Sequence, residues 1–455
     1  MNATLETPPS TYRDGLASPP QRWAVVGGGF LGMEIARQLR EANHDVTLIE
    51  RAPNLGGLAD SWSVGEVTWD RHYHVILMSD LRVRELLDQL GIADALRWVE
   101  TKTGFFTDGK LVSMSNAVEF LKFPPLRLID KIRLGSTIFY ASKIRNWKRL
   151  ETIPVVDWLR SWSGTRTTEK IWLPLLRAKL GENYRYASAA FIWAIIARMY
   201  AARRTGLKKE MFGYARGGYG KIIDHFADAL RTAGIEISAG TAVRSIAKSA
   251  DGLRVETADG SHATYDRVVV TAAAPVVPLL CPDLPTNEAN RWRNLRYQGI
   301  VCASLVLKKP LANYYVTNIT ESWVPFTAVI EMTTLVDPAE FDGKTLIYLP
   351  KYVTPDDPLF DASDDTIRES FIGALAKMYP HFTPDDVLAF RVSRVRHVLA
   401  IPTIDYSANL PPMVTSIPGL YVANSAHIVN GTLNVNETLQ LADRAVAQLL
   451  SEVRA

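Results

Sequence analysis

The chain has 455 residues and a mass of 50.6 kDa, with 47% hydrophobic residues, 22% charged residues and a formal net charge of +3. At roughly 100–200 residues per domain, this length allows two to four folded units, and the composition excludes wholesale disorder. Only two cysteines are present, Cys281 and Cys302, which excludes a disulfide scaffold and a zinc site made of four cysteines.

Residues 1–21 are polar and rich in proline, without an apolar core after a basic start, so we expect a flexible tail and no secretion signal. The longest uncharged apolar run, residues 187–197, is shorter than the roughly 20 residues that a membrane-spanning helix needs. We therefore expect a cytoplasmic protein, and peripheral attachment at the inner face of a membrane stays open as an alternative.

The strongest motif follows residues 23–26, an apolar run typical of a buried parallel strand. It reads G-x-G-x-x-G from Gly27 to Gly32 and leads into a stretch of helical composition. A second apolar run, Asp45–Ile49, ends at Glu50, 23 positions after Gly27. Glycines, helix and terminal acid in this order predict a βαβ unit that binds a dinucleotide.

Each part of the motif has a mechanical reason. Gly27 permits a tight turn, Gly29 lets the backbone approach a pyrophosphate, and Gly32 lets helix and strand pack closely. The carboxylate of Glu50 suits a ribose diol and repels a 2′-phosphate, which favours FAD or NAD over NADP. The predicted contacts to the dinucleotide come from Gly27, Gly29, Phe30, Leu31, Gly32 and Glu50.

After Glu50 comes Arg51, then Leu55-Gly56-Gly57-Leu58, which gives R-x-x-x-L-G-G. Here the chain resembles the FAD superfamily of amine oxidases, protoporphyrinogen oxidase and phytoene desaturase. The resemblance implies FAD as the cofactor, with Arg51, Gly56, Gly57 and Leu58 beside it. It also implies a backbone contact from Val243 to adenine, and polar contacts to the flavin from Asn424 and from a helix N-terminus at Val435. The family usually has Gly-Asp where this chain has Ala423-Asn424.

The implied fold is α/β: a Rossmann-type, glutathione-reductase-like FAD domain of the amine oxidase subgroup, with an inserted α+β substrate domain. The FAD domain is expected to combine residues 22–103, 217–292 and 411–455, and the substrate domain residues 104–216 and 293–410. The first insertion is expected to be helical and the second rich in strands. Helices are expected in the first insertion over residues 118–123, 126–150, 156–162, 170–180 and 187–202.

Charge is unevenly distributed along the chain. Residues 104–216 hold 21 Lys and Arg against 8 Asp and Glu, a surplus of 13, so the rest of the chain carries about −10. This surplus favours an anionic small-molecule substrate, and no nucleic-acid-binding module accompanies it. The stretch 126–150 resembles a basic amphipathic helix, which either contacts an anionic membrane or only packs on its own domain.

Candidate catalytic groups are fewer. Residues 69–74 (W-D-R-H-Y-H) stand where many relatives bring a loop over the flavin ring, and an extended segment places His72 and His74 on one face. Either histidine is a candidate proton shuttle or a hydrogen-bonded structural residue. A metal site is not expected, because no third ligand cluster is visible.

Residues 325–331 (P-F-T-A-V-I-E) resemble a strand of UDP-galactopyranose mutase, with Ala328 in place of that family's arginine. Glu331 is a candidate acid or base, or else a structural carboxylate, and Lys351 and Tyr352 are further candidates for the substrate cleft.

We therefore predict an FAD-dependent oxidoreductase. It would take a hydride to flavin N5 from a C–N, C–C or C–O centre of an anionic, amphipathic or sugar-linked substrate. A redox-neutral sugar mutase and a non-catalytic flavin-binding protein stay open as alternatives. The electron acceptor and the oligomeric state stay open as well.

Overall fold

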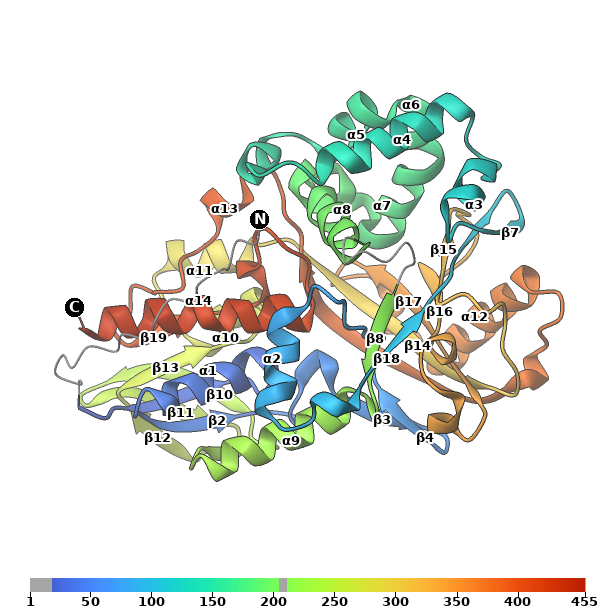
Figure 1. Ribbon diagram of the computed structural model, residues 1–455. Helices are drawn as coiled ribbons and strands as arrows, with labels where there is room; N and C mark the ends of the chain where they lie inside the picture. Colours follow the sequence, from blue (N-terminus) through green and yellow to red (C-terminus); the bar gives the residue numbers. More distant parts are fainter. Residues whose placement is uncertain (1–18, 204–210, 455) are drawn as a thin grey trace, which may run out of the picture.

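The computed structural model describes residues 19–203 and 211–454. Most of the tail expected over residues 1–21 therefore lies outside the described residues. Figure 1 shows a parallel sheet at the lower left, a second sheet at the right and a group of helices above both. Among the described residues, no helix is long and apolar enough to cross a membrane.

Five short strands form the parallel sheet, in the order β19-β13-β1-β2-β9. The strands are β1 (Arg22–Val26), β2 (Asp45–Ile49), β9 (Glu236–Ser238), β13 (Arg267–Val270) and β19 (Leu420–Val422). Helices and hairpins cover both faces of this sheet, which explains why its central strands are continuous apolar runs. All five strands come from the three segments assigned above to the FAD domain, and the exact domain boundaries stay predictions.

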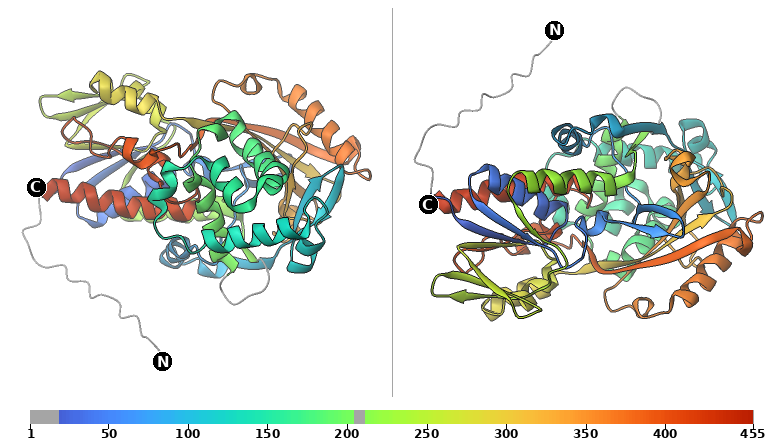
Figure 2. Two further views of the ribbon diagram at one scale, coloured as in Figure 1. Left: turned by 90° about the horizontal axis from the view of Figure 1, so that it is seen from above. Right: turned by 90° about the horizontal axis from the view of Figure 1, so that it is seen from below.

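Side chains of the sheet alternate between two cores. Trp23, Val25 and Leu48 pack against three helices, whereas Ala24 and Val26 pack against the hairpin side (Figure 2). The helices on the first face are α1 (Phe30–Glu41), α9 (Gly218–Thr232) and α14 (Val435–Arg454). The elements on the second face are β10 (Val243–Ser249), β11 (Gly252–Thr257), β12 (His262–Tyr265), α10 (Val277–Leu280) and α11 (Thr286–Arg293).

The second sheet has seven strands in the order β18-β14-β17-β16-β15-β6-β7. Their bounds are β6 (Thr103–Thr107), β7 (Lys110–Ser113), β14 (Tyr297–Leu307), β15 (Val316–Ile319), β16 (Ala328–Glu331), β17 (Thr345–Val353) and β18 (Val387–Ala400). Helix α12 (Asp364–Met378) packs its apolar side into the core of this sheet. The first insertion begins with strands, since β6 and β7 form a hairpin. The hairpin forms because Asp108 and Gly109, both with positive φ, make a two-residue turn.

Helices from the first insertion stand over the two sheets. They are α3 (Ala117–Lys122), α4 (Leu128–Ala141), α5 (Val155–Ser163), α6 (Thr165–Thr167), α7 (Leu173–Leu180) and α8 (Ala189–Arg203), and a π turn over Thr168–Trp172 leads into α7. Smaller elements complete the fold: α2 (Leu81–Gln89), β3 (Ser61–Val64), β4 (Val67–Asp70), β5 (Leu96–Glu100), β8 (Met211–Ala215) and α13 (Tyr406–Asn409).

The expectation of one helix over residues 126–150 is wrong. Helix α4 ends at Ala141, and a turn leads to a 3-10 helix over Trp147–Thr152. The buried positions of α4 continue as 134, 137 and 141, so an unbroken helix would bury Arg145 and Lys148 at the next two turns. The turn instead lets Ile144 and Trp147 pack on the core and leaves these two cations exposed.

A buried carboxylate stabilises the packing of three helices next to the parallel sheet. Glu34 on α1 is fully buried and pairs with Arg37 on its own helix and with Arg82 on α2. Arg82 Nε also donates to Asp443 on α14, with an Nε–Oδ2 distance of 3.0 Å. A buried carboxylate is tolerated only while such partners remain, so this network locks α1, α2 and α14 into one arrangement.

We expect Arg82→Met to lower the free energy of unfolding by about 3 kcal/mol, because Glu34 stays buried with only part of its pairing. Arg185→Met is the matched control, since Arg185 pairs with Glu182 on the exposed surface and its loss is expected to have a much smaller effect. Urea unfolding with excess FAD measures both variants. Equal effects of the two substitutions would show that the network does not hold the helices.

Candidate functional site

The loop between β1 and α1 is compact enough to require its glycines. Gly27 has a φ of +115°, and a Cβ on it would overlap the hydroxyl of Thr271. A Cβ on Gly32 would overlap the carbonyl oxygen of Gly27. Strand, turn and helix therefore meet at a separation that only bare backbone permits.

A second glycine loop lies directly against the first. Gly56 and Gly57 have φ values of +108° and +60°, and the Gly56 N–H donates to the carbonyl of Gly28 at 2.8 Å. Gly29 and Gly56 form a parallel bridge. Two stretches of main chain without side chains thus stand side by side at the edge of the parallel sheet.

The polar groups around these loops suit a pyrophosphate and a ribose. Helix α1 begins after Gly29 with no side-chain cap and no acid in its first turn, so the N–H groups at Phe30 and Leu31 present partial positive charge. The Glu50 carboxylate accepts the N–H groups of Gly28 at 2.6 Å and Ala52 at 2.7 Å. Each of its oxygens keeps a second lone pair for a diol.

The other residues that the resemblance assigned to the cofactor lie near these loops or at the end of β19. The loop before Val243 contacts the end of β2, since the Thr241 N–H donates to the Glu50 carbonyl at 2.8 Å. Arg51 is exposed. Asn424 follows β19, and its Oδ1 accepts the Ala426 N–H at 3.0 Å, while its buried Nδ2 has no hydrogen-bond partner among the described residues.

Helix α14 starts at Val435, which is buried, and Asn434 caps it by accepting the Glu437 N–H at 3.0 Å. Together with the orphaned amide of Asn424, the uncapped α1 terminus and the two bare loops, this geometry fits FAD. These residues would hold the cofactor, and which of them contacts it stays a prediction.

Residues 70–74 connect the glycine loops to the second sheet. Arg71 donates to the Gly57 carbonyl at 2.7 Å, and its buried Nε has no hydrogen-bond partner among the described residues. His72 contacts the Leu58 carbonyl through Nδ1 at 3.1 Å and the hydroxyl of Ser393 on β18 through Nε2, also at 3.1 Å. Both nitrogens of His72 are thus engaged, which favours its structural role over proton transfer.

His74 is placed differently. Its buried Nδ1 has no hydrogen-bond partner among the described residues and lies 3.9 Å from Oδ2 of Asp70, and its ring centroid is 5.1 Å from that of Tyr219. Burial lowers the pKa of His74 to about 4 and that of His72 to about 3. Burial also raises the pKa of Asp70 to about 8, although the Tyr219 N–H donates to its carboxylate. All three groups are therefore mostly uncharged at neutral pH.

Beyond His74, three residues from distant parts of the chain come together. The hydroxyls of Tyr73 and Tyr352 are 2.8 Å apart, and Nζ of Lys179 on α7 lies 3.5 Å from the centroid of the Tyr352 ring. Burial lowers the pKa of the neighbouring Lys351. The sequence predicts Lys351 and Tyr352 as candidates for the substrate cleft. It does not predict Tyr73 and Lys179, because charge and spacing give no specific signal for them.

Glu331 supports a turn. Its two carboxylate oxygens accept the N–H groups of Leu311 at 3.0 Å and Ala312 at 3.1 Å, and burial raises its pKa. These contacts favour the structural reading of Glu331, and its catalytic role stays an untested prediction. Ala328, where the mutase pattern has arginine, is a buried apolar residue of β16.

Comparison with known proteins now identifies the family. The model of the family described as flavin containing amine oxidoreductase matches residues 32–450. The chain belongs to this family. It is accordingly an FAD-dependent oxidoreductase by family, with a Rossmann-type FAD fold.

Curated relatives of this family member are carotenoid desaturases. The 15-cis-phytoene desaturase of Narcissus pseudonarcissus is 21% identical over 84% of this chain and 70% of its own length. The zeta-carotene desaturase of Synechocystis is 28% identical, but the match spans only 32% of this chain and 30% of the relative.

Solved structures show the same fold at low identity. A protein described as a protoporphyrinogen oxidase, from Exiguobacterium, has a TM-score of 0.74 and 19% identity, covering 95% of this chain and 99% of its own. Reduced UDP-galactopyranose mutase has a TM-score of 0.72 and 15% identity, covering 95% of this chain and 96% of its own. At these identities the likeness supports the fold and leaves the substrate open.

We expect Gly32→Ala to weaken FAD binding by roughly a hundredfold, because the new Cβ must push the glycine loop away from α1. Gly373→Ala on α12 is the control, since its Cβ meets open space and alanine suits a helix better than glycine does. Visible flavin absorption per mole of purified protein measures the difference. Full flavin content in Gly32→Ala would contradict the role of this loop.

Asp70 makes stability depend on pH in the direction opposite to that of His72 and His74, whose pKa values burial lowers. The pKa of Asp70 is 3.8 when unfolded and about 8 when folded, so its neutral form stabilises the fold, and this contribution is lost progressively as pH rises from about 4 to about 8. Asp70→Asn keeps an acceptor for the Tyr219 N–H and cannot ionise. We expect the stability of the variant relative to the wild type to rise by a few kcal/mol between about pH 4 and about pH 8 and to stay level at higher pH, in urea unfolding. Parallel pH profiles would contradict this assignment.

Proposed function

We propose that the protein oxidises an amphipathic substrate, with an apolar body and an anionic end, by transfer of a hydride to N5 of the bound flavin. One observation carries this proposal: residues 70–74 run from the carbonyls of Gly57 and Leu58 to the cluster of Tyr73, Tyr352 and Lys179. A substrate beside this segment would lie between the cofactor loops and a cation.

Lys179 supports an anionic end for the substrate. Lys179 is half-buried, its ammonium lies over the Tyr352 ring, and it has no ion-pair partner among the described residues. Lys351, the neighbour of Tyr352 on β17, points to the opposite face of the sheet, toward the core that α12 covers, so of these two lysines it is Lys179 that lies beside the Tyr352 ring. A carboxylate or phosphate placed here would gain a charge-assisted contact in a partly water-excluded setting.

Three neutral side chains in residues 70–74 support an apolar body, and the Arg71 guanidinium of this segment is held at the Gly57 carbonyl. Asp70, His72 and His74 are mostly neutral at neutral pH because burial disfavours their charged forms. When a carbon–carbon bond is oxidised, a proton leaves as well as the hydride, and the neutral imidazole of His74 is the candidate acceptor in this segment. The relatives named as desaturases favour a C–C centre over C–N and C–O.

The sugar mutase is the second candidate, supported by the structural likeness to UDP-galactopyranose mutase and by the strand pattern at residues 325–331. Against it stands Ala328, which supplies no charge where the mutase pattern supplies an arginine. The two candidates differ in electron balance, because a mutase returns its electrons to the product.

The deciding experiment mixes the FAD-loaded protein, without oxygen, with long-chain carboxylates, polyprenyl phosphates, phytoene and UDP-galactose. We expect an amphipathic anion to bleach the flavin and to gain a double bond. Turnover of UDP-galactose only after dithionite reduction, without net oxidation, would favour the mutase. Bleaching by phytoene and by none of the anions would contradict the proposal that the substrate has an anionic end. No change with any compound would favour a non-catalytic protein.

In the same assay, Lys179→Met is expected to raise the concentration for half-maximal bleaching roughly tenfold with little change in the limiting rate, because one charge-assisted contact is lost. Lys377→Met is the matched control, a lysine next to the Trp323 ring on the far side of the second sheet. A lower limiting rate without a change in half-saturation would contradict a binding role for Lys179.

A further inference from the structure

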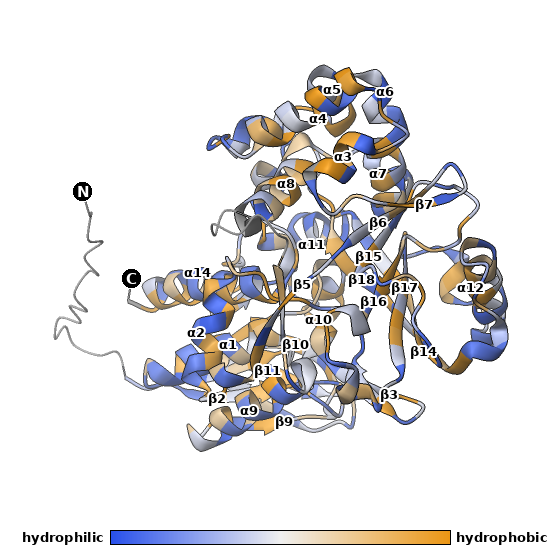
Figure 3. Cartoon of the chain, turned by 45° about the vertical axis from the view of Figure 1, so that its right-hand side comes forward, coloured by the Kyte–Doolittle hydropathy of each residue, from blue (hydrophilic) through white to orange (hydrophobic). Residues whose placement is uncertain are grey.

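Helices α3 and α4 expose an unusual number of large apolar side chains. On α4 the exposed fractions are 64% for Leu128, 56% for Ile132 and 56% for Phe139, at a spacing that places them along one stripe of the helix. On α3, Val118 and Leu121 are exposed to 59% and 56%. Figure 3 shows hydrophobic residues along α3 and α4 in the helical group.

The exposed stripe is not the face that α4 uses within the fold. Leu134, Thr137 and Ala141 lie on the other side of the helix and are buried. The helix therefore has two largely apolar faces, of which the fold covers one. Exposed apolar surface of this extent is typical of a contact site for another molecule.

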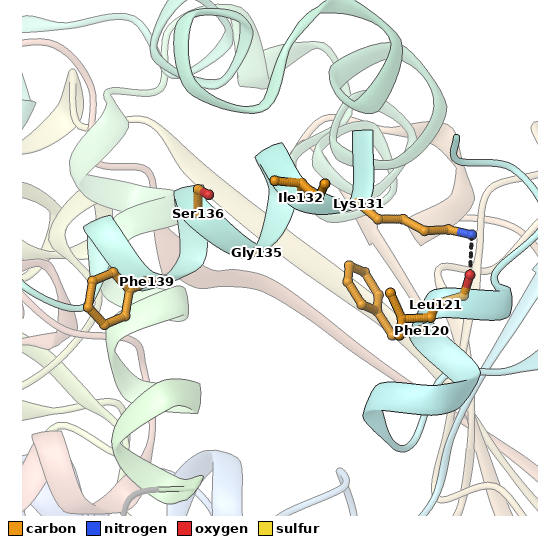
Figure 4. A pocket seen from close by; sticks show the side chains of 7 residues that line it. All are labelled: Phe120, Leu121, Lys131, Ile132, Gly135, Ser136 and Phe139. Atoms are coloured by element: carbon orange, nitrogen blue, oxygen red, sulfur yellow. Dashed lines mark hydrogen bonds between the residues drawn. The ribbon is translucent and has the colours of Figure 1, made fainter. Parts of the chain in front are cut away.

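A groove separates α3 from α4 and has a volume of about 430 Å³. Phe120 and Leu121 line it from α3, and Ile132 and Phe139 line it from α4 (Figure 4). Nζ of Lys131 donates to the Leu121 carbonyl at 2.6 Å, which ties the end of α3 to α4 and holds the two apolar stripes together.

Charge around this surface is mainly positive, and the carboxylate of Glu119 on α3 accepts the Ser115 N–H. Between residues 120 and 149 the exposed charged side chains are Lys122, Arg127, Arg133, Lys143, Arg145, Lys148 and Arg149. The only carboxylate in this stretch, on Asp130, is buried, accepts the Arg127 N–H at 3.1 Å and pairs with Arg166. The surface thus offers exposed apolar side chains on a stretch that also exposes seven cations, which complements an anionic partner.

We propose that this α3–α4 surface docks the protein onto an anionic lipid bilayer, with the apolar stripes in the acyl boundary and the cations at the headgroups. Apolar residues flanked by lysine and arginine are the pattern of helices that lie in a membrane interface. A second copy of the chain is a poorer partner, because its own seven cations would face these seven.

The test uses the full-length, FAD-loaded protein and sedimentation with vesicles of phosphatidylcholine alone or with phosphatidylglycerol added. We expect binding to the anionic vesicles, weaker binding to neutral ones, and a fall in binding as salt is raised. Binding to neither kind of vesicle would overturn the proposal, and so would equal binding to both.

Two double variants separate the apolar and the cationic contributions. Leu128→Glu with Ile132→Glu, and Lys143→Glu with Arg145→Glu, are each expected to weaken vesicle binding at least about tenfold. Their controls are Leu279→Glu, at a leucine exposed to 71% on α10, and Lys248→Glu with Arg254→Glu on the β10–β11 hairpin. Flavin absorption confirms that each variant is folded.

Unchanged binding in either test variant, or equal loss in the controls, would overturn the proposal. A dimer in solution that Leu128→Glu with Ile132→Glu dissociates, without vesicle binding by the wild type, would assign the surface to contact between copies. None of these readouts depends on turnover, so failure of the proposed oxidation would leave this result unaffected.

Discussion

The close approach of two glycine loops is the constraint on which the site depends. Gly32 meets the carbonyl of Gly27, and Gly29 stands beside Gly56, so no side chain fits between β1, α1 and the loop that follows β2. This packing exposes the α1 terminus and fixes Glu50 across the loop. Main-chain groups, which are rigid and carry no net charge, thereby form most of the surface available to the cofactor.

The same loops also position the residues that face away from the sheet. The carbonyls of Gly57 and Leu58 hold Arg71 and His72, and the following residues place Tyr73 against Tyr352. Nδ1 of His74 has no hydrogen-bond partner in the part of the chain that the structure describes. Burial then keeps Asp70, His72 and His74 mostly neutral. The guanidinium of Arg71 lies at the Gly57 carbonyl and the ammonium of Lys179 lies beside the Tyr352 ring, so cationic groups stand at both ends of the path from the loops to the second sheet.

The sequence predicted features that depend on residues close together in the chain, and it missed contacts between residues far apart in the chain. The glycine fingerprint, the apolar strands and the family resemblance depend on neighbouring residues, and each was readable from local order. The prediction of one helix over 126–150 was wrong because it used amphipathic spacing alone. That spacing does not show which face is buried, and so it does not show that a longer helix would bury Arg145 and Lys148. Tyr73, Lys179 and Tyr352 are separated by more than a hundred residues each, so only the topology brings them together.

The helical group contains residues of both the proposed substrate site and the proposed membrane-binding surface. Its outer side, α3 and α4, carries the apolar and cationic surface, and its inner side contributes Lys179 to the cluster at Tyr352. Arg198 on α8 fastens this group to the cofactor side, donating to Asp80 at 3.0 Å and to the Thr432 hydroxyl at 3.2 Å, shortly before α14 begins. An amphipathic substrate partitions into membranes, so a helical group held at both the cofactor side and a bilayer would shorten its path to the site.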